Sequence, residues 1–149
     1  MVQRFREREA YGMKFAQTDQ QIKTYLKQGD NCCEAILKTA DKFWQLGLRK
    51  ETLWTARFFK EGMHSGCACG ALVGIVMVSG ILEQTKANPF GSDLPSHLHS
   101  KFIMENGSSC CRVLRNNQGL RERINNKGCC AITEKAMRIL IEAWEDNSE

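Results

Sequence analysis

Cysteine is the residue type that could do chemistry in this chain, because all eight cysteines stand in four tight pairs. A cysteine thiolate binds soft metals, holds iron–sulfur clusters and attacks disulfides. Random placement of eight residues among 149 would not give this pairing, so the pairs indicate a site. The pairs are Cys32 with Cys33, Cys67 with Cys69, Cys110 with Cys111, and Cys129 with Cys130.

A helix-start signal precedes each pair, and a run with helical apolar periodicity follows it. We therefore expect four helix N-termini to carry thiols. Unpaired N–H groups and the helix dipole favour a thiolate at such a position. The signals are Asn31, then Ser65 with Gly66, then Ser108 with Ser109, and finally Gly128.

The spacing within each pair limits how many sulfurs can face one point. Adjacent residues of a helix diverge by about 100°, and residues two apart diverge by about 200°. One cysteine of each pair can therefore face a shared site while the other generally points elsewhere. The spacing predicts four working sulfurs and four companions.

The elements that position these cysteines are predicted to be helices, because helical periodicity is common and strand-like alternation is scarce. The expected fold is all-α, a single-domain bundle of about six or seven helices around a central glycine-rich apolar helix. The domain spans residues 1–149, with an N-terminal helix within 1–28 and a cysteine-bearing core over 31–145. A short helix is expected over 51–59, with its tryptophan and two phenylalanines in the core.

The apolar run from Ala68 to Leu82 predicts the buried central helix. It is about 22 Å long at helical rise, short of a hydrocarbon core of roughly 30 Å, so no membrane span is expected. Gly66, Gly70 and Gly74 recur at four-residue spacing within it. Such a stripe lets a neighbouring helix come close, either within the chain or across a homodimer, and the sequence leaves both open.

Composition argues against a nucleic-acid-binding function and favours metal or redox chemistry. A net charge of +4 with 42% hydrophobic and 26% charged residues is ordinary for a globular protein. The basic residues between positions 112 and 127 are too few for a typical nucleic-acid module, so no nucleic-acid partner is expected. The charged N-terminus lacks the apolar core of a secretory signal, which favours the cytoplasm. Thiols stay reduced there, and dense cysteine indicates metal or redox chemistry.

Four ordered stretches around the cysteines carry a further pattern. Residues 69–74 are Cys-Gly-Ala-Leu-Val-Gly, residues 31–35 are Asn-Cys-Cys-Glu-Ala, residues 107–112 are Gly-Ser-Ser-Cys-Cys-Arg, and Cys129 precedes Ala136 and Ile139. This order resembles a family of redox-active proteins named for its spaced cysteines and its Cys-Gly-Ala-x-x-Gly motif. The resemblance covers residues 31–141.

The resemblance implies a site of four cysteines, with the companions as a second tier. The family is similar to a cytochrome-associated iron–sulfur domain, which implies a cluster. The chain contains no Cys-x-x-Cys-His, so covalent haem is not supported. Either member of the last pair fits the last position, although Cys129 is preferred. The implied ligands are Cys32, Cys69, Cys111 and Cys129, and the second tier, suited to a second metal or a relay, is Cys33, Cys67, Cys110 and Cys130.

Three functions fit this pattern. The first is electron transfer through an iron–sulfur cluster on the four implied cysteines, with a redox protein as partner. The second is a thiol–disulfide oxidoreductase in which Cys69 or Cys32 attacks, with a protein or a small thiol as partner. The third is a structural zinc module that binds another protein. The usual ferredoxin, Cys-x-x-Cys and zinc-knuckle spacings are absent. The choice among the three functions therefore depends on how the fold brings the cysteines together.

Overall fold

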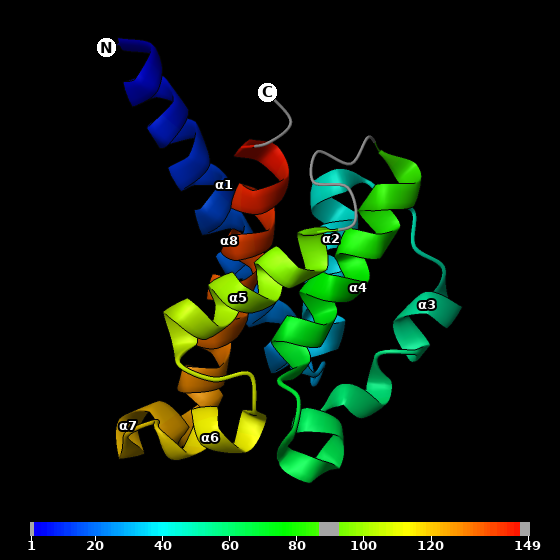
Figure 1. Ribbon diagram of the computed structural model, residues 1–149, viewed down its shortest axis with the longest axis vertical. Helices are drawn as coiled ribbons and strands as arrows, with labels where there is room; N and C mark the ends of the chain where they lie inside the picture. The colour runs from blue at the N-terminus through cyan, green and yellow to red at the C-terminus, as the bar shows by residue number, and fades with distance from the viewer. Residues whose placement is uncertain (1, 87–92, 147–149) are drawn as a thin grey trace.

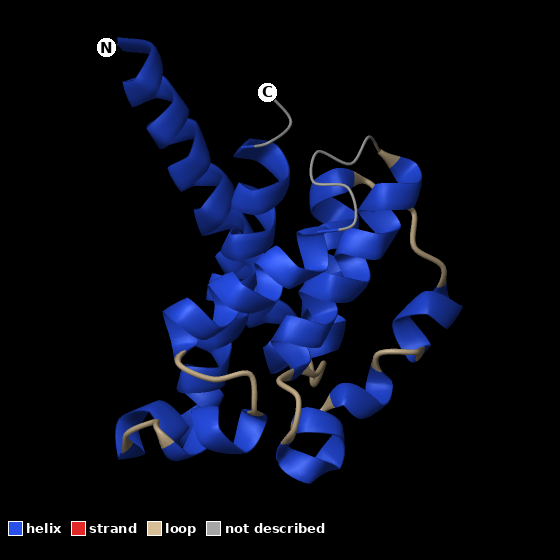
Figure 2. Cartoon of the chain, in the orientation of Figure 1, coloured by secondary structure: helices blue, strands red, loops and turns tan. Residues whose placement is uncertain are grey.

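Helices form nearly all of the regular structure in the computed structural model, which describes residues 2–86 and 93–146, and only the backbone of residues 2–5. No strand occurs within these ranges (Figure 2), so the all-α prediction is confirmed. None of the described helices has the length and apolar character needed to cross a bilayer. The long helices are α1 (Val2–Lys27), α2 (Cys32–Trp44), α4 (Gly70–Thr85), α5 (Leu94–Asn106) and α8 (Lys127–Asp146).

Short helical pieces connect the long helices. The helix expected over 51–59 is divided into two of these pieces, and the prediction that its aromatic residues join the core is wrong for two of the three. Trp54 is 64% exposed and Phe58 is 73% exposed, whereas Phe59 packs against the core and the small Ala56 is fully buried. The short pieces are α3 (Lys50–Trp54), η1 (Arg57–Phe59), η2 (Gly62–Gly66), α6 (Cys111–Asn116), α7 (Leu120–Arg123) and η4 (Ile124–Asn126).

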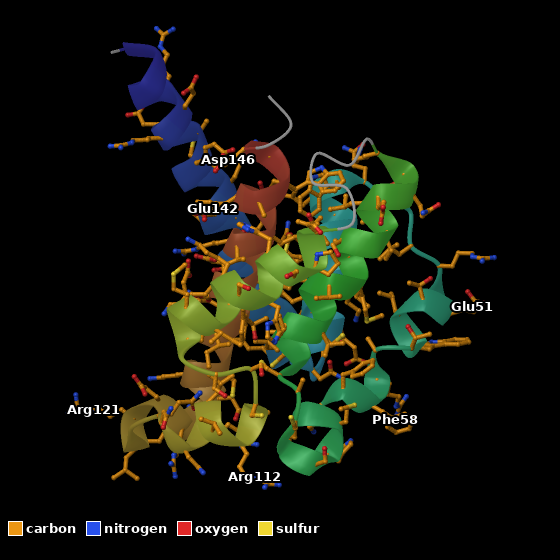
Figure 3. The ribbon with its side chains drawn as sticks, in the orientation of Figure 1. Glu51, Phe58, Arg112, Arg121, Glu142 and Asp146 are labelled. Carbon is orange, nitrogen blue, oxygen red and sulfur yellow. The ribbon has the colours of Figure 1, made fainter. Side chains whose placement is uncertain are left out.

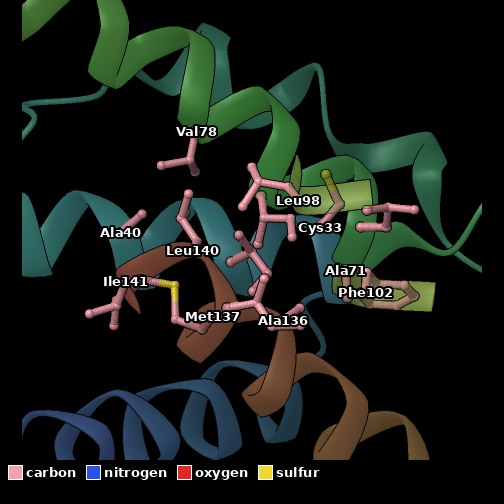
Figure 4. Close-up of a cluster of buried hydrophobic side chains, with 14 of the residues drawn as sticks. Cys33, Ala40, Ala71, Val78, Leu98, Phe102, Ala136, Met137, Leu140 and Ile141 are labelled. Atoms are coloured by element: carbon pink, nitrogen blue, oxygen red, sulfur yellow. The ribbon is translucent and has the colours of Figure 1, made fainter. Parts of the chain in front are cut away.

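The core lies where α2, α4, α5 and α8 meet. Helix α8 buries Ala136, Ile139, Leu140 and Ala143, which follow the three- and four-residue spacing of one helix face. Figure 4 shows side chains from all four helices in this cluster, with Phe102 of α5 among them. Helix α8 packs against α2, α4 and α5, and α5 packs against α4 as well, so the ends of these helices are held at fixed positions.

The N-terminal ends of three long helices share one end of the molecule. In Figure 1, α1 descends from the N terminus, and α2, α4 and α8 then run back in the opposite direction, with α6 at the lower end. Helix α1 packs along α2 and α8. The dipeptide Asn88-Pro89 and the residues Gly91-Ser92-Asp93 also predict a loop over 87–96, which lies mostly outside the described residues. The bundle therefore gathers the cysteine pairs at one end.

Glycines allow α4 to pack closely against its neighbours. A Cβ on Gly74 would lie 2.9 Å from the Cβ of Ile36 in α2, and a Cβ on Gly70 would lie 2.9 Å from the carbonyl oxygen of Phe59. Both of these close contacts occur within one chain, so neither glycine needs a homodimer to explain it. Gly66 lies outside α4, in η2, with a φ of +84°, so the predicted stripe of three glycines holds for two of them.

Candidate cysteine site

A cavity of about 630 Å³ lies at the end of the bundle where the cysteine-bearing helices begin. One cysteine from each of the first three pairs lines it, namely Cys32, Cys69 and Cys111, and both members of the last pair do so. These residues come from elements far apart in the sequence. The fold therefore brings all four implied ligands to one space, while their role as ligands stays a prediction.

Asn31 fixes the start of α2 and with it the position of Cys32. The backbone N–H of Glu34 donates to Asn31 Oδ1 (2.9 Å), and the backbone N–H of Asn31 donates to Glu34 Oε2 (2.8 Å), which is a complete capping box. The side-chain amide of Asn31 also donates to the carbonyls of Ala56 (3.1 Å) and Arg57 (3.0 Å). One side chain thus ties the first cavity cysteine to the segment that leads toward the second.

The second and third pairs are held together by the backbone. The N–H of Cys69 donates to the carbonyl of Ser109 at 2.7 Å, which links the residue before α4 to the segment before α6. Gly62, with a φ of +61°, fits between them, because a Cβ there would lie 2.4 Å from the nitrogen of Cys67 and 3.0 Å from the Cβ of Cys111. This close packing sets the separation of two cavity walls.

The fourth pair lies in the first turn of α8. The Cys129 sulfur is 3.9 Å from Nε2 of Gln118, and the Thr133 hydroxyl donates to the Cys129 carbonyl at 2.7 Å. Thr133 is fully buried and also contacts the side chain of Cys32. Sequence reasoning missed Thr133, although its place four residues after Cys129 puts both on one helix face.

Burial dominates the electrostatics of the cavity thiols. It raises the pKa of Cys32 to about 12 and that of Cys69 to about 11, and it also raises the pKa of Cys111. The hydroxyl of Thr133 opposes the rise at Cys32, and the backbone N–H groups of Ala71 and Leu72 oppose it at Cys69. The predicted stabilisation of the thiolate by a helix N-terminus is therefore present at Cys69, but burial has the larger effect on its pKa. A bound cation would reverse this balance by displacing the thiol protons.

The residues that line the cavity include more basic than acidic side chains. Glu61 and Arg115 form an ion pair (3.3 Å), and Lys23 lies 3.7 Å from Glu134. An anionic group in the cavity would therefore meet a favourable field. The basic residues in the lining are Lys23, Lys27, Lys60, Arg115 and Lys127, and the acidic ones are Asp30, Glu61 and Glu134.

The companion cysteines have three different surroundings. Cys33 is buried in the core, with its sulfur 3.7 Å from that of Met77. Cys130 lines the cavity and lies 3.4 Å from Glu134 Oε1. Cys67 and Cys110 lie outside the cavity lining, with their sulfurs 3.1 Å apart. Of the second tier, only Cys130 shares the cavity.

The cavity does not have the geometry of a single-ion site. Across residues 2–86 and 93–146, no three His, Cys, Asp or Glu side chains are grouped as ligands of one metal ion. Four sulfurs bound at about 2.3 Å from a tetrahedral zinc would lie about 3.8 Å from one another. The cavity of about 630 Å³ is larger than a compact group of that kind needs.

The helical bundle and its cavity define a cysteine-rich, all-α protein. The chain belongs to the family described as "Putative redox-active protein (C_GCAxxG_C_C)", whose model matches residues 30–143. That range includes all four cysteine pairs and confirms the resemblance drawn from the motifs. Among curated proteins and among solved structures, none matches the chain.

Proposed function

We propose that this protein transfers electrons through an iron–sulfur cluster held by Cys32, Cys69, Cys111 and Cys129. The observation that carries the proposal is that one cysteine from each of four distant pairs lines the same cavity. Four cysteine thiolates are the usual ligand set of such clusters, which supply one-electron chemistry when bound. A reducing cytoplasm suits the eight free thiols.

The size of the cavity favours a cluster over a single zinc ion. A multi-iron group places inorganic sulfide between its metals, so its thiolate ligands stand further apart than those of one tetrahedral ion. The volume of about 630 Å³ leaves room for the larger arrangement. The basic residues of the lining would offset the negative charge of four thiolates.

The chain's own groups would tune such a site. Leu114 and Ile132 form apolar parts of the cavity wall and would keep water from the thiolates. The N–H groups of Ala71 and Leu72 face the Cys69 sulfur and would stabilise its anionic form. Solvent exclusion and donors directed at sulfur are the two main ways in which a protein sets a cluster's potential.

Electrostatic contacts favour Cys129 over Cys130 as the fourth ligand. After burial, Cys129 is among the neighbouring thiols that raise the pKa values of Cys32, Cys69 and Cys111. Burial and then Glu134 raise the pKa of Cys130 to about 11. Cys129 therefore lies among the other three candidate ligands, whereas Cys130 faces a carboxylate.

The thiol–disulfide alternative is less well supported at the cysteines first considered for it. Attack on a disulfide requires a thiolate that is accessible to the substrate. Burial raises the pKa of Cys69 to about 11 and that of Cys32 to about 12, so at neutral pH both are protonated. Neither cysteine is therefore in the thiolate form that attack on a disulfide requires.

The test is anaerobic purification followed by absorption and electron paramagnetic resonance spectroscopy, with iron, sulfide and zinc measured on the same sample. We expect visible absorption together with iron and acid-labile sulfide. Serine at Cys32, Cys69 or Cys111 should abolish all three signals, whereas Cys67→Ser should keep them because Cys67 lies outside the cavity. Anaerobic protein with neither iron nor sulfide, or with zinc alone, would refute the proposal.

A further inference from the structure

We propose that Cys67 and Cys110 form a second redox site, a reversible dithiol–disulfide couple that exchanges with small disulfides of the glutathione type. Their sulfurs are 3.1 Å apart. A disulfide bond is about 2.05 Å long, so about 1 Å of approach would close it. This site goes beyond the proposed cluster, because neither cysteine lines the cavity.

The two sulfurs are brought together by contacts of their own segments. The N–H of Cys69 donates to the carbonyl of Ser109 at 2.7 Å, next to both cysteines. On the other side, the guanidinium of Arg112 donates to the carbonyl of Ser65 at 2.7 Å. These two hydrogen bonds flank the sulfur pair and join the η2 segment to the start of α6. The short separation is therefore built into the fold.

The pair is accessible to a substrate, in contrast to the buried companion in α2. Cys67 is exposed and Cys110 is partly exposed, whereas Cys33 is fully buried. Figure 3 shows Arg112, which contacts the same η2 segment, at the outer edge of the molecule. A small disulfide can therefore reach Cys67 without any opening of the bundle.

The exchange is balanced by the disulfide that it consumes. The contact with Cys110 raises the pKa of the Cys67 thiol and the charge of Arg112 lowers it, and unlike Cys32 and Cys69 this thiol is exposed to the substrate. After losing its proton, the Cys67 thiolate attacks one sulfur of oxidised glutathione, which forms a mixed disulfide and releases one glutathione thiolate. The Cys110 thiolate then attacks the Cys67 sulfur, which forms the internal bond and releases the second glutathione thiolate. The two protein thiols are oxidised, one small disulfide is reduced to two thiols, and the two protein protons pass to the released thiolates.

The test uses the full chain equilibrated in buffers with a range of oxidised to reduced glutathione ratios. After an acid quench and thiol blocking, peptide mass spectrometry identifies each bond. We expect a Cys67–Cys110 linked peptide whose fraction rises with the ratio and falls again on return to reduced glutathione. Cys33, which is buried, should stay a free thiol in the same samples. Iron and sulfide are measured in parallel, so that loss of a cluster is scored separately.

Two single variants separate the roles of the pair. Cys110→Ser should trap glutathione on Cys67, because the resolving thiol is gone, and Cys67→Ser should form no internal bond. Cys33→Ala removes a cysteine that the step does not use and should leave the wild-type response unchanged. A wild-type protein that accumulates glutathionylated Cys67 without the internal bond would overturn the proposal. So would linkage of Cys67 chiefly to another cysteine.

Discussion

Asn31 and Glu34 close a reciprocal pair of hydrogen bonds immediately around Cys32, with Asn31 Oδ1 accepting at 2.9 Å and Glu34 Oε2 accepting at 2.8 Å. The pair determines where α2 begins. Because the Asn31 amide also donates to two carbonyls of the 56–57 segment, the same residue holds a cavity wall in place. Asn31 is therefore a structural support for Cys32.

Replacing Asn31 should cost stability in two separable parts. Asn31→Ala loses both the helix cap and the two amide hydrogen bonds, so we expect a loss of about 2–3 kcal/mol. Asn31→Ser keeps a capping oxygen and loses only the amide donors, so its loss should be smaller. Urea unfolding followed by circular dichroism measures both. An alanine variant as stable as wild type would contradict this account.

Two glycines of α4 should respond oppositely to alanine. Gly74→Ala places a Cβ 2.9 Å from the Cβ of Ile36, and overpacking of this kind costs about 1–3 kcal/mol. Gly80 lies in the same helix, and a Cβ added to it would have no neighbouring atom within 4 Å. Gly80→Ala should therefore stabilise the protein by about 0.5–1 kcal/mol. Thermal unfolding of the two variants compares a packed glycine with an open one.

In the last cysteine pair, we expect Cys129 to bind the proposed cluster and Cys130 not to bind it. Cys129→Ser should lose the iron and sulfide that the proposed function predicts, while Cys130→Ser should keep both. A group that binds only the folded state raises its stability, so the loaded Cys130→Ser protein should melt above its cluster-free form. Cys129→Ser should show no such difference. The reverse pattern would assign Cys130 as the ligand.

Glu142 should make the stability of α8 depend on pH. Burial, and then the charge of Glu105, raise its pKa above the usual 4.5. The protonated form is therefore favoured in the fold, and stability is lost as pH rises from the unfolded pKa through the folded one. Glu142→Gln should match wild type near pH 3 and exceed it at pH 7. The gain should be only about 0.5 kcal/mol, because the group is partly solvated.

Glu145 provides the matched control for Glu142 on the same helix. Its carboxylate lies 2.8 Å from the Lys14 ammonium of α1, so Glu145→Gln removes an ion pair and should lower stability slightly at pH 7. Opposite signs for the two variants, measured by urea unfolding at both pH values, would support this assignment. Because the net charge is +4, a gain from both would instead show that local repulsion among the acidic residues near the end of α8 dominates.

Local patterns predict the parts of the fold that local chemistry determines. The cap at Asn31 and the buried central helix follow from residues close in sequence. The core positions predicted for Trp54 and Phe58 are wrong, because a two-turn segment does not reveal which side faces the bundle. The small Ala56 fills the buried position there instead.

The spacing allows one cysteine of each pair to face a shared site, and the family resemblance implies which four, but neither shows how the helices bring them together. Whether Cys32 and Cys129 share a cavity depends on how α2 and α8 pack, which no nearby residue encodes. The contact between Cys67 and Cys110 was not foreseen for the same reason, since 43 residues separate them. Helix geometry accounts for the first pair, because Cys32 and Cys33 both lie in α2, and one lines the cavity while the other is buried in the core. It does not account for the second and third pairs, because Cys67, Cys69 and Cys110 have extended backbone outside the helices.

Gly70, which follows Cys69, allows the start of α4 to lie close to its neighbours because it has no side chain. A Cβ on Gly70 would meet the Phe59 carbonyl at 2.9 Å and the Cβ of Cys32 at 3.6 Å. A larger side chain there would press on the Phe59 carbonyl, so α4 or the η1 segment would have to shift, whereas the approach to Cys32 is ordinary van der Waals contact. The glycine that follows Cys69 in this motif thus lets the start of α4 lie directly against the η1 backbone, which keeps the Cys69 segment close to the chain that follows α2.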